Sequence, residues 1–141
     1  MTAAPLASTI VAIGLIPVAF FFVHAFWSGR KKQRIHPVTG AIAISWDLVL
    51  SIGYMLYRSF GGAVEGSSIQ LTPVLNIYFG IHGAVAVVVM ALEITVLAVG
   101  IKMVKAKAPN QWHKKLTKVL FGFWWFAFLS GELFYLIMYI F

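Results

Sequence analysis

Two ionisable residues, His82 and Glu93, lie inside a long apolar stretch of the chain and are the first candidates for chemistry. The stretch runs from Pro73 to Val104 and is long enough to cross a bilayer. An imidazole or carboxyl group at that depth is costly unless it faces the interior of a helix bundle and finds a partner there. The two residues are eleven apart, about three helical turns, so both should project from one face. We therefore expect this face to line the centre of the protein.

A second apolar run carries a matching polar face. Asp47 and Arg58 are also eleven apart, and Tyr54 lies between them at helical spacing. Counting at about 1.5 Å per residue from the predicted helix ends places Asp47 and Glu93 at one level. Two carboxyl groups at one level should share a proton or a cation. The alternative is a hydrogen bond between the two acids that only fixes the helix register.

The same count predicts a second polar layer in the outer half of the bundle. There Arg58 should approach His82 and Glu132. The remaining histidines, His24, His36 and His113, should lie at or near the inner rim. Three imidazoles at one level could ligate a metal, or a pair of them could hold a haem iron. Each could equally be an interfacial residue beside lipid head groups.

Four apolar helices must position these residues. The chain has 141 residues, of which 61% are hydrophobic and 11% charged, which is too apolar for a soluble domain of this size. We predict an all-α integral membrane protein with a single domain over residues 1–141 and transmembrane helices at about 6–28, 37–60, 73–104 and 112–141. Short connections imply an up-down-up-down antiparallel bundle. Aromatic residues of the last run are interpreted as packing and interfacial anchors: Trp112, Trp124, Trp125, Phe126 and Phe128.

Basic residues gather around two of the predicted connections. Ten of the eleven lysines and arginines lie within residues 30–34 and 102–118. The positive-inside rule then places both basic connections in the cytoplasm, and both termini and the loop from Gly61 to Thr72 outside the cell membrane. The positive charge therefore indicates orientation and attraction to lipid, and it does not favour nucleic acid. The chain has no cysteine, which excludes thiolate metal sites, iron–sulfur clusters and covalently attached haem.

Several short motifs can be compared with a known family: Arg34-Ile35-His36, Gly53-Tyr54-Met55-Leu56-Tyr57, Tyr78-Phe79-Gly80-Ile81-His82, Trp112-His113-Lys114-Lys115, Ser130-Gly131 and Tyr135-Leu136. In this order they resemble the CtaM or YozB-like proteins, small four-helix membrane proteins linked to the biogenesis of haem-copper terminal oxidases. The resemblance covers about residues 29–141. It implies functional histidines at His36, His82 and His113.

One position departs from the family pattern. The resemblance implies a further histidine near the end of the second helix, where this chain has Arg58. Arginine stays protonated and cannot ligate a metal. Either Glu132 supplies the missing ligand, or an Arg–Glu pair has replaced an outer metal site.

Three functions are consistent with these features. The leading one is a non-enzymatic accessory or assembly protein of a respiratory membrane complex, which binds a transition metal such as copper or zinc, or haem, through histidines. The second is a small b-type cytochrome that carries electrons to or from quinone, and the third is a purely structural small subunit. No P-loop, nucleophile elbow or zinc-protease motif is present, so we do not expect an enzyme. The expected partners are the lipid bilayer and other membrane subunits.

Overall fold

Four long helices make up the structure, a computed structural model that describes residues 5–60 and 72–141. They are α1 (Leu6–Arg30), α2 (His36–Ser59), α3 (Pro73–Ala106) and α4 (Gln111–Tyr135), and a five-residue π-helix, Leu136–Ile140, follows α4. The prediction of an all-α protein with four helices is confirmed. The last helix differs from the prediction, because the α-helix ends at Tyr135 and the chain continues as a π-helix. Most of the predicted outer loop, residues 61–71, lies outside the described residues.

The helix ends have local causes in the sequence. Thr72 caps α3 by accepting a hydrogen bond from the Leu75 amide at 3.3 Å, and Pro73 occupies the first helical position, where its missing N–H costs nothing. Asn110 caps α4 in the same way through the Trp112 amide at 2.9 Å. At the end of α3, Lys107 adopts a left-handed conformation with φ of 50°, which stops the helix.

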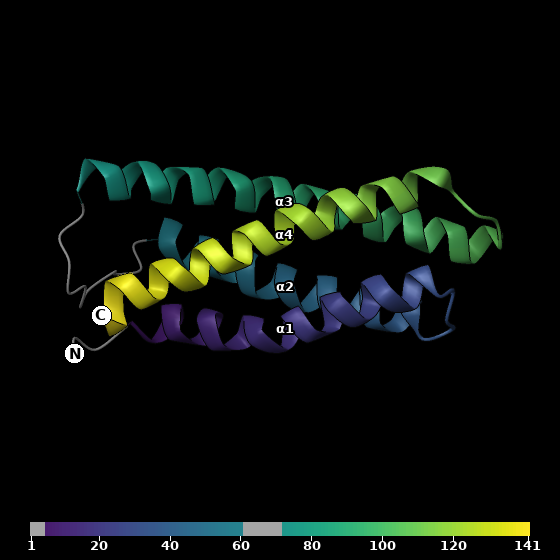
Figure 1. Cartoon of the computed structure of the whole chain (residues 1–141), viewed down its shortest axis with the longest axis horizontal. Coiled ribbons are helices and arrows are strands. Elements are labelled where there is room, and N and C mark those ends of the chain that lie inside the picture. The colour runs from purple at the N-terminus through teal and green to yellow at the C-terminus, as the bar shows by residue number, and fades with distance from the viewer. Residues whose placement is uncertain (1–4, 61–71) are drawn as a thin grey trace.

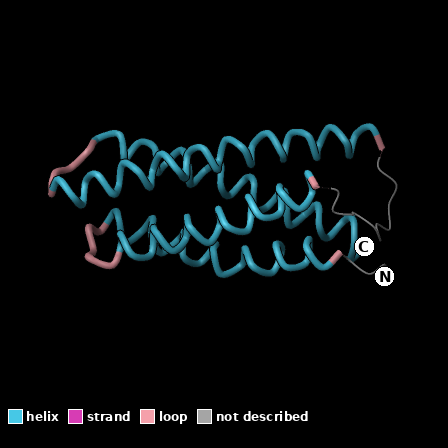
Figure 2. The backbone as a smooth tube through the Cα atoms, turned by 180° about the vertical axis from the view of Figure 1, so that it is seen from behind, coloured by secondary structure: helices cyan, strands magenta, loops and turns pink. Residues whose placement is uncertain are grey.

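The helices run lengthwise beside one another, and α1 begins at the same end of the bundle at which the π-helix ends (Figure 1). The two short connections, α1–α2 and α3–α4, lie together at the opposite end, as the view from behind also shows (Figure 2). We call this the connection end, and the other the terminal end. The helices pack most extensively as two hairpins, α1 with α2 and α3 with α4, and the hairpins meet through α1–α4 and α2–α3. We call this meeting surface the seam.

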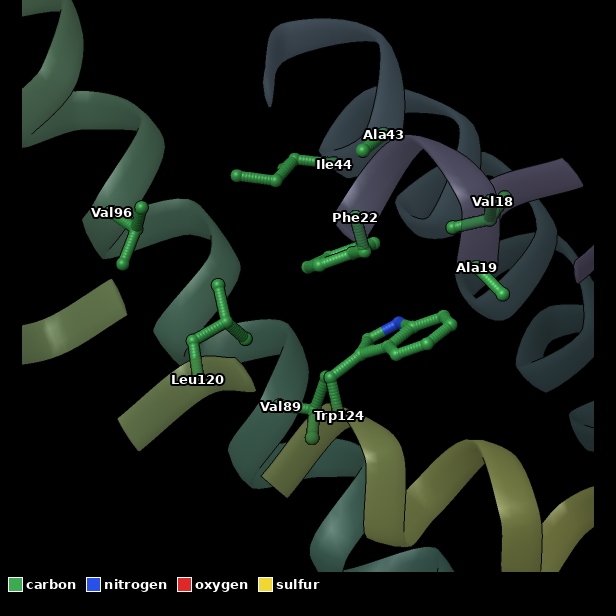
Figure 3. Close-up of a cluster of buried hydrophobic side chains, with 9 residues drawn as sticks. All are labelled: Val18, Ala19, Phe22, Ala43, Ile44, Val89, Val96, Leu120 and Trp124. Atoms are coloured by element: carbon green, nitrogen blue, oxygen red, sulfur yellow. The ribbon is translucent and has the colours of Figure 1, made fainter. Parts of the chain in front are cut away.

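All four helices contribute to one buried core, shown in Figure 3: Val18, Ala19, Phe22, Ala43, Ile44, Val89, Val96, Leu120 and Trp124. The outside of the bundle is also apolar. Phe20 and Val49 are 73% and 72% exposed, and large aliphatic or aromatic side chains are exposed on every helix. Each of the four helices is long and apolar enough to cross a membrane.

Candidate functional site

Two acidic residues lie buried at the middle of the bundle. Asp47 on α2 is 4% exposed and Glu93 on α3 is 0% exposed. One oxygen of Asp47, Oδ2, accepts a hydrogen bond from the Trp124 indole Nε1 at 3.2 Å, which links α2 to α4 across the bundle. The other, Oδ1, accepts a hydrogen bond from the Ser51 hydroxyl at 3.4 Å. Both Asp47 oxygens therefore have donors.

The Glu93 carboxyl has a different environment. Among the described residues, neither of its oxygens has a hydrogen-bond partner within 3.5 Å. It does lie close enough to the Asp47 carboxyl for the two groups to interact electrostatically. A buried polar group without a hydrogen bond is costly, so Glu93 is the least compensated polar side chain in the core.

Trp124 positions the Asp47 carboxyl. Its indole stacks on Phe22 at a centroid distance of 4.5 Å and on Phe128 at 5.0 Å. Figure 3 shows the ring inside the core next to Phe22. Of the two roles predicted for Trp124, packing and interfacial anchoring, the structure confirms packing: at 2% exposure it is a core residue whose N–H binds a carboxyl group. A sequence signal existed, because His113, Trp124 and Tyr135 are spaced by eleven residues on α4.

A histidine pair lies at the connection end. His36 begins α2, His113 lies in the first turn of α4, and their ring centroids are 6.0 Å apart with the ring planes at 75°. The Nδ1 atom of His36 is 2.7 Å from the Ala25 carbonyl oxygen. Because a carbonyl only accepts, Nδ1 carries the hydrogen and Nε2 keeps its lone pair. The Nδ1 atom of His113 is buried and has no hydrogen-bond partner among the described residues.

The third rim histidine does not join this pair. His24 lies on α1 with its side chain exposed on the outside of the bundle. Within residues 5–60 and 72–141, no group of three histidine, aspartate or glutamate side chains is arranged to hold a metal. The prediction that His24, His36 and His113 could together ligate a metal is therefore wrong. The position of His24 on α1 places its side chain on the outer surface of the bundle, away from the other two histidines. The structure brings together only His36 and His113.

The half of the α3–α4 hairpin nearer the terminal end contains a separate network around Ser130. The Ser130 hydroxyl donates to the Ala127 carbonyl at 3.1 Å, so the His82 Nδ1–H donates to the Ser130 oxygen at 2.7 Å. Tyr78 donates to the Ser130 carbonyl at 2.6 Å. These bonds join α3 to α4 and fix the orientation of the His82 ring.

The predicted layer of Arg58, His82 and Glu132 does not form. Arg58 makes no ion pair or hydrogen bond with either residue and instead lies near the Tyr139 hydroxyl. Tyr54, on the same face of α2, turns instead to α1, where its hydroxyl lies 3.1 Å from that of Ser8. Glu132 is half-buried on α4 and has no hydrogen bond within the part of the chain that the structure describes.

Three of the histidines pack against glycines of the neighbouring helix in their hairpin. A Cβ atom built on Gly29 would lie 2.7 Å from the His36 ring, and one on Gly131 would lie 3.0 Å from the His82 ring. The corresponding distance from Gly100 to the His113 ring is 3.4 Å. The absence of a side chain at these glycines lets each imidazole approach the adjacent backbone.

No protein-family model, curated protein or solved structure matches this chain. Among the described residues, the arrangements best suited to chemistry are the His36–His113 pair at the connection end and the Asp47–Glu93 pair at the centre.

Proposed function

We propose that the protein is a small, non-enzymatic accessory protein of the cell membrane that holds a transition metal ion between His36 and His113. The resemblance to the CtaM or YozB-like family implies that it serves a respiratory complex of the haem-copper oxidase type. The four apolar helices and the apolar outer surface support a membrane location. The chain then crosses the bilayer up-down-up-down.

The charge distribution supports an orientation for this bundle. Basic residues gather around the connection end, within residues 30–34 and 102–118. By the positive-inside rule the connection end is cytoplasmic, and both termini are outside. The His36–His113 pair therefore lies near the cytoplasmic face of the membrane.

The observation that carries the metal proposal is the 6.0 Å separation between the two imidazole rings. Bonds of about 2.0–2.1 Å from a metal to each of two imidazole nitrogens span a gap of this size, since each centroid lies beyond its own nitrogen. The Ala25 carbonyl holds the His36 ring through Nδ1, as outer partners of metal-binding histidines commonly do. The His113 ring, whose buried Nδ1 lies beside Gly100 and near the Val96 backbone, would supply the second nitrogen ligand.

The donor set indicates which ions would fit. Two neutral imidazoles suit copper or zinc and are poor ligands for magnesium or calcium, which prefer oxygen. Two protein ligands leave further coordination positions for a group from a partner protein. Such a site suits an accessory protein that receives an ion and passes it on.

The same ring separation also favours a second candidate function. His36 and His113, from facing helices, would then hold a haem b, as in a small b-type cytochrome that exchanges electrons with quinone. The histidines and their hydrogen bonds would then set the haem's orientation, and the haem would supply the redox chemistry.

Metal analysis and visible spectroscopy of the full-length protein, purified from its native membrane in mild detergent, test these proposals. We expect one copper or zinc ion per molecule in the wild type and in the His24→Ala control. We expect the ion to be absent from His36→Ala and from His113→Ala. A reducible Soret band with bound iron would instead support the cytochrome. Folded wild-type protein with neither signal would leave a structural subunit as the best account.

A further inference from the structure

The buried acids Asp47 and Glu93 form a polar site that the proposed metal pair does not use. They lie on α2 and α3, on opposite sides of the seam, and both are almost completely buried. Each helix at this level can be checked for a compensating charge. Helix α1 contributes Phe22 and other apolar side chains, and α4 contributes the uncharged indole of Trp124. Among the described residues, no basic side chain pairs with either acid.

The two acids have unequal surroundings. Asp47 accepts hydrogen bonds from Trp124 and Ser51, and such donors stabilise a carboxylate. Glu93 accepts none from the described residues, and it is 0% exposed. An ionised Glu93 would therefore be an uncompensated charge beside a second negative charge in the interior of the bundle. A protonated, neutral Glu93 avoids both the buried charge and the repulsion from Asp47. Its O–H group can also donate a hydrogen bond to the Asp47 carboxylate.

We propose that Asp47 and Glu93 form a proton-binding site, in which Glu93 carries one exchangeable proton and directs it to the Asp47 carboxylate. The pair then has a single negative charge. Moving the proton breaks the O–H bond at a Glu93 oxygen and forms one at an Asp47 oxygen, and the charge of the pair stays the same. Trp124 and Ser51 act as positioning residues, because their hydrogen bonds keep the negative charge on Asp47.

A metal cation fits this site less well than a proton. The Trp124 N–H points its positive end at one Asp47 oxygen, and the Ser51 hydroxyl donates to the other. A cation would have to displace these donors to reach that carboxylate. A calcium ion would also need about six to eight oxygen ligands, and magnesium about six. Four carboxylate oxygens, two of which already accept hydrogen bonds, do not provide such a shell.

Infrared spectroscopy of the full-length protein in lipid vesicles at neutral pH tests the proposal, because a protonated carboxyl group has a carbonyl-stretching band that a carboxylate lacks. We expect such a band in the wild type, a shift of the band in heavy water, and its loss in Glu93→Gln. Glutamine has the size of a protonated glutamate, so the variant should fold. Glu132→Gln is the matched control and should keep the band.

Further outcomes distinguish one shared proton from other states of the pair. If Asp47→Asn removes a second carboxyl band, both acids are protonated and the proposal is wrong. If folded Glu93→Gln keeps every band of the wild type, Glu93 is ionised and the proposal fails. A band that never shifts in heavy water would show that the proton does not exchange.

A variant that leaves both acids in place covers the case in which Glu93→Gln does not fold. Trp124→Phe keeps an aromatic ring between Phe22 and Phe128 but removes the N–H donor to Asp47. We expect the Glu93 band to shift as the proton moves toward Asp47. An unchanged band would mean that the two carboxyl groups do not share the proton.

Discussion

At the scale of single residues, the hydrogen bond from Trp124 to Asp47 should stabilise the fold, since it joins the two hairpins inside an apolar core. Trp124→Phe should lower the free energy of unfolding by about 1–3 kcal/mol, because Asp47 keeps its burial and loses a donor. Trp125→Phe is the control variant, because the Trp125 ring contacts Trp124 and Phe128 but its N–H has no hydrogen bond among the described residues. Chemical denaturation in detergent measures both variants, and equal losses would contradict the prediction.

The depths of Asp47 and Glu93 could be estimated from the sequence, because the rise per residue in a helix is constant. The hydrogen-bond and packing partners of single side chains could not be predicted from the sequence. An indole is suited equally to a membrane interface and to a core, and only packing against Phe22 and Phe128 decides for Trp124. The direction of Arg58 depended on which elements the polar face of α2 would meet: Tyr54 meets α1, and Arg58 lies near Tyr139 of the π-helix.

At the scale of helices, the contact between Gly29 and His36 determines how closely α1 and α2 approach. A Cβ atom in Gly29→Ala would lie 2.7 Å from the His36 ring and push it from its place against Ala25. We expect a loss of stability of about 1–3 kcal/mol, as overpacking usually causes, together with weaker metal binding. Gly40→Ala is the matched control on α2, where nothing lies within 4 Å of the added atom. Thermal unfolding and metal titration of both variants check this.

Helix boundaries were predictable wherever a residue enforces them. Pro37, Pro73 and Asn110 are turn or cap residues, and α2, α3 and α4 begin at or next to them. The π-helix at Leu136–Ile140 has no comparable signal, because its residues are as apolar as those before it. Its residues Met138 and Tyr139 are buried, which is a property of the packed bundle.

At the scale of the whole molecule, the absence of cysteine allows the proposed orientation to be measured directly. Single cysteines at Gln33 and Ala108, in the two short connections, should react with a membrane-impermeant maleimide only after intact cells are permeabilised. A cysteine at Ser59, the exposed last residue of α2, should react without permeabilisation. The reverse labelling pattern would place the His36–His113 pair on the outer face.

The contacts within each hairpin differ from those across the seam, and this difference indicates that the two halves of the chain need not be covalently linked. The glycine–histidine contacts and the Ser130 network lie within a hairpin. Three contacts cross the seam: the Asp47–Trp124 hydrogen bond, the His36–His113 pair, and the 2.9 Å contact between the Thr9 and Tyr135 hydroxyls. Each half should therefore enter the bilayer alone and then dock as a preformed piece. Co-expressed fragments 1–66 and 67–141 should co-purify as a heterodimer, and Trp124→Phe should reduce the yield. Both proposed binding sites would then exist only after docking, so that dissociation of the halves would abolish them together.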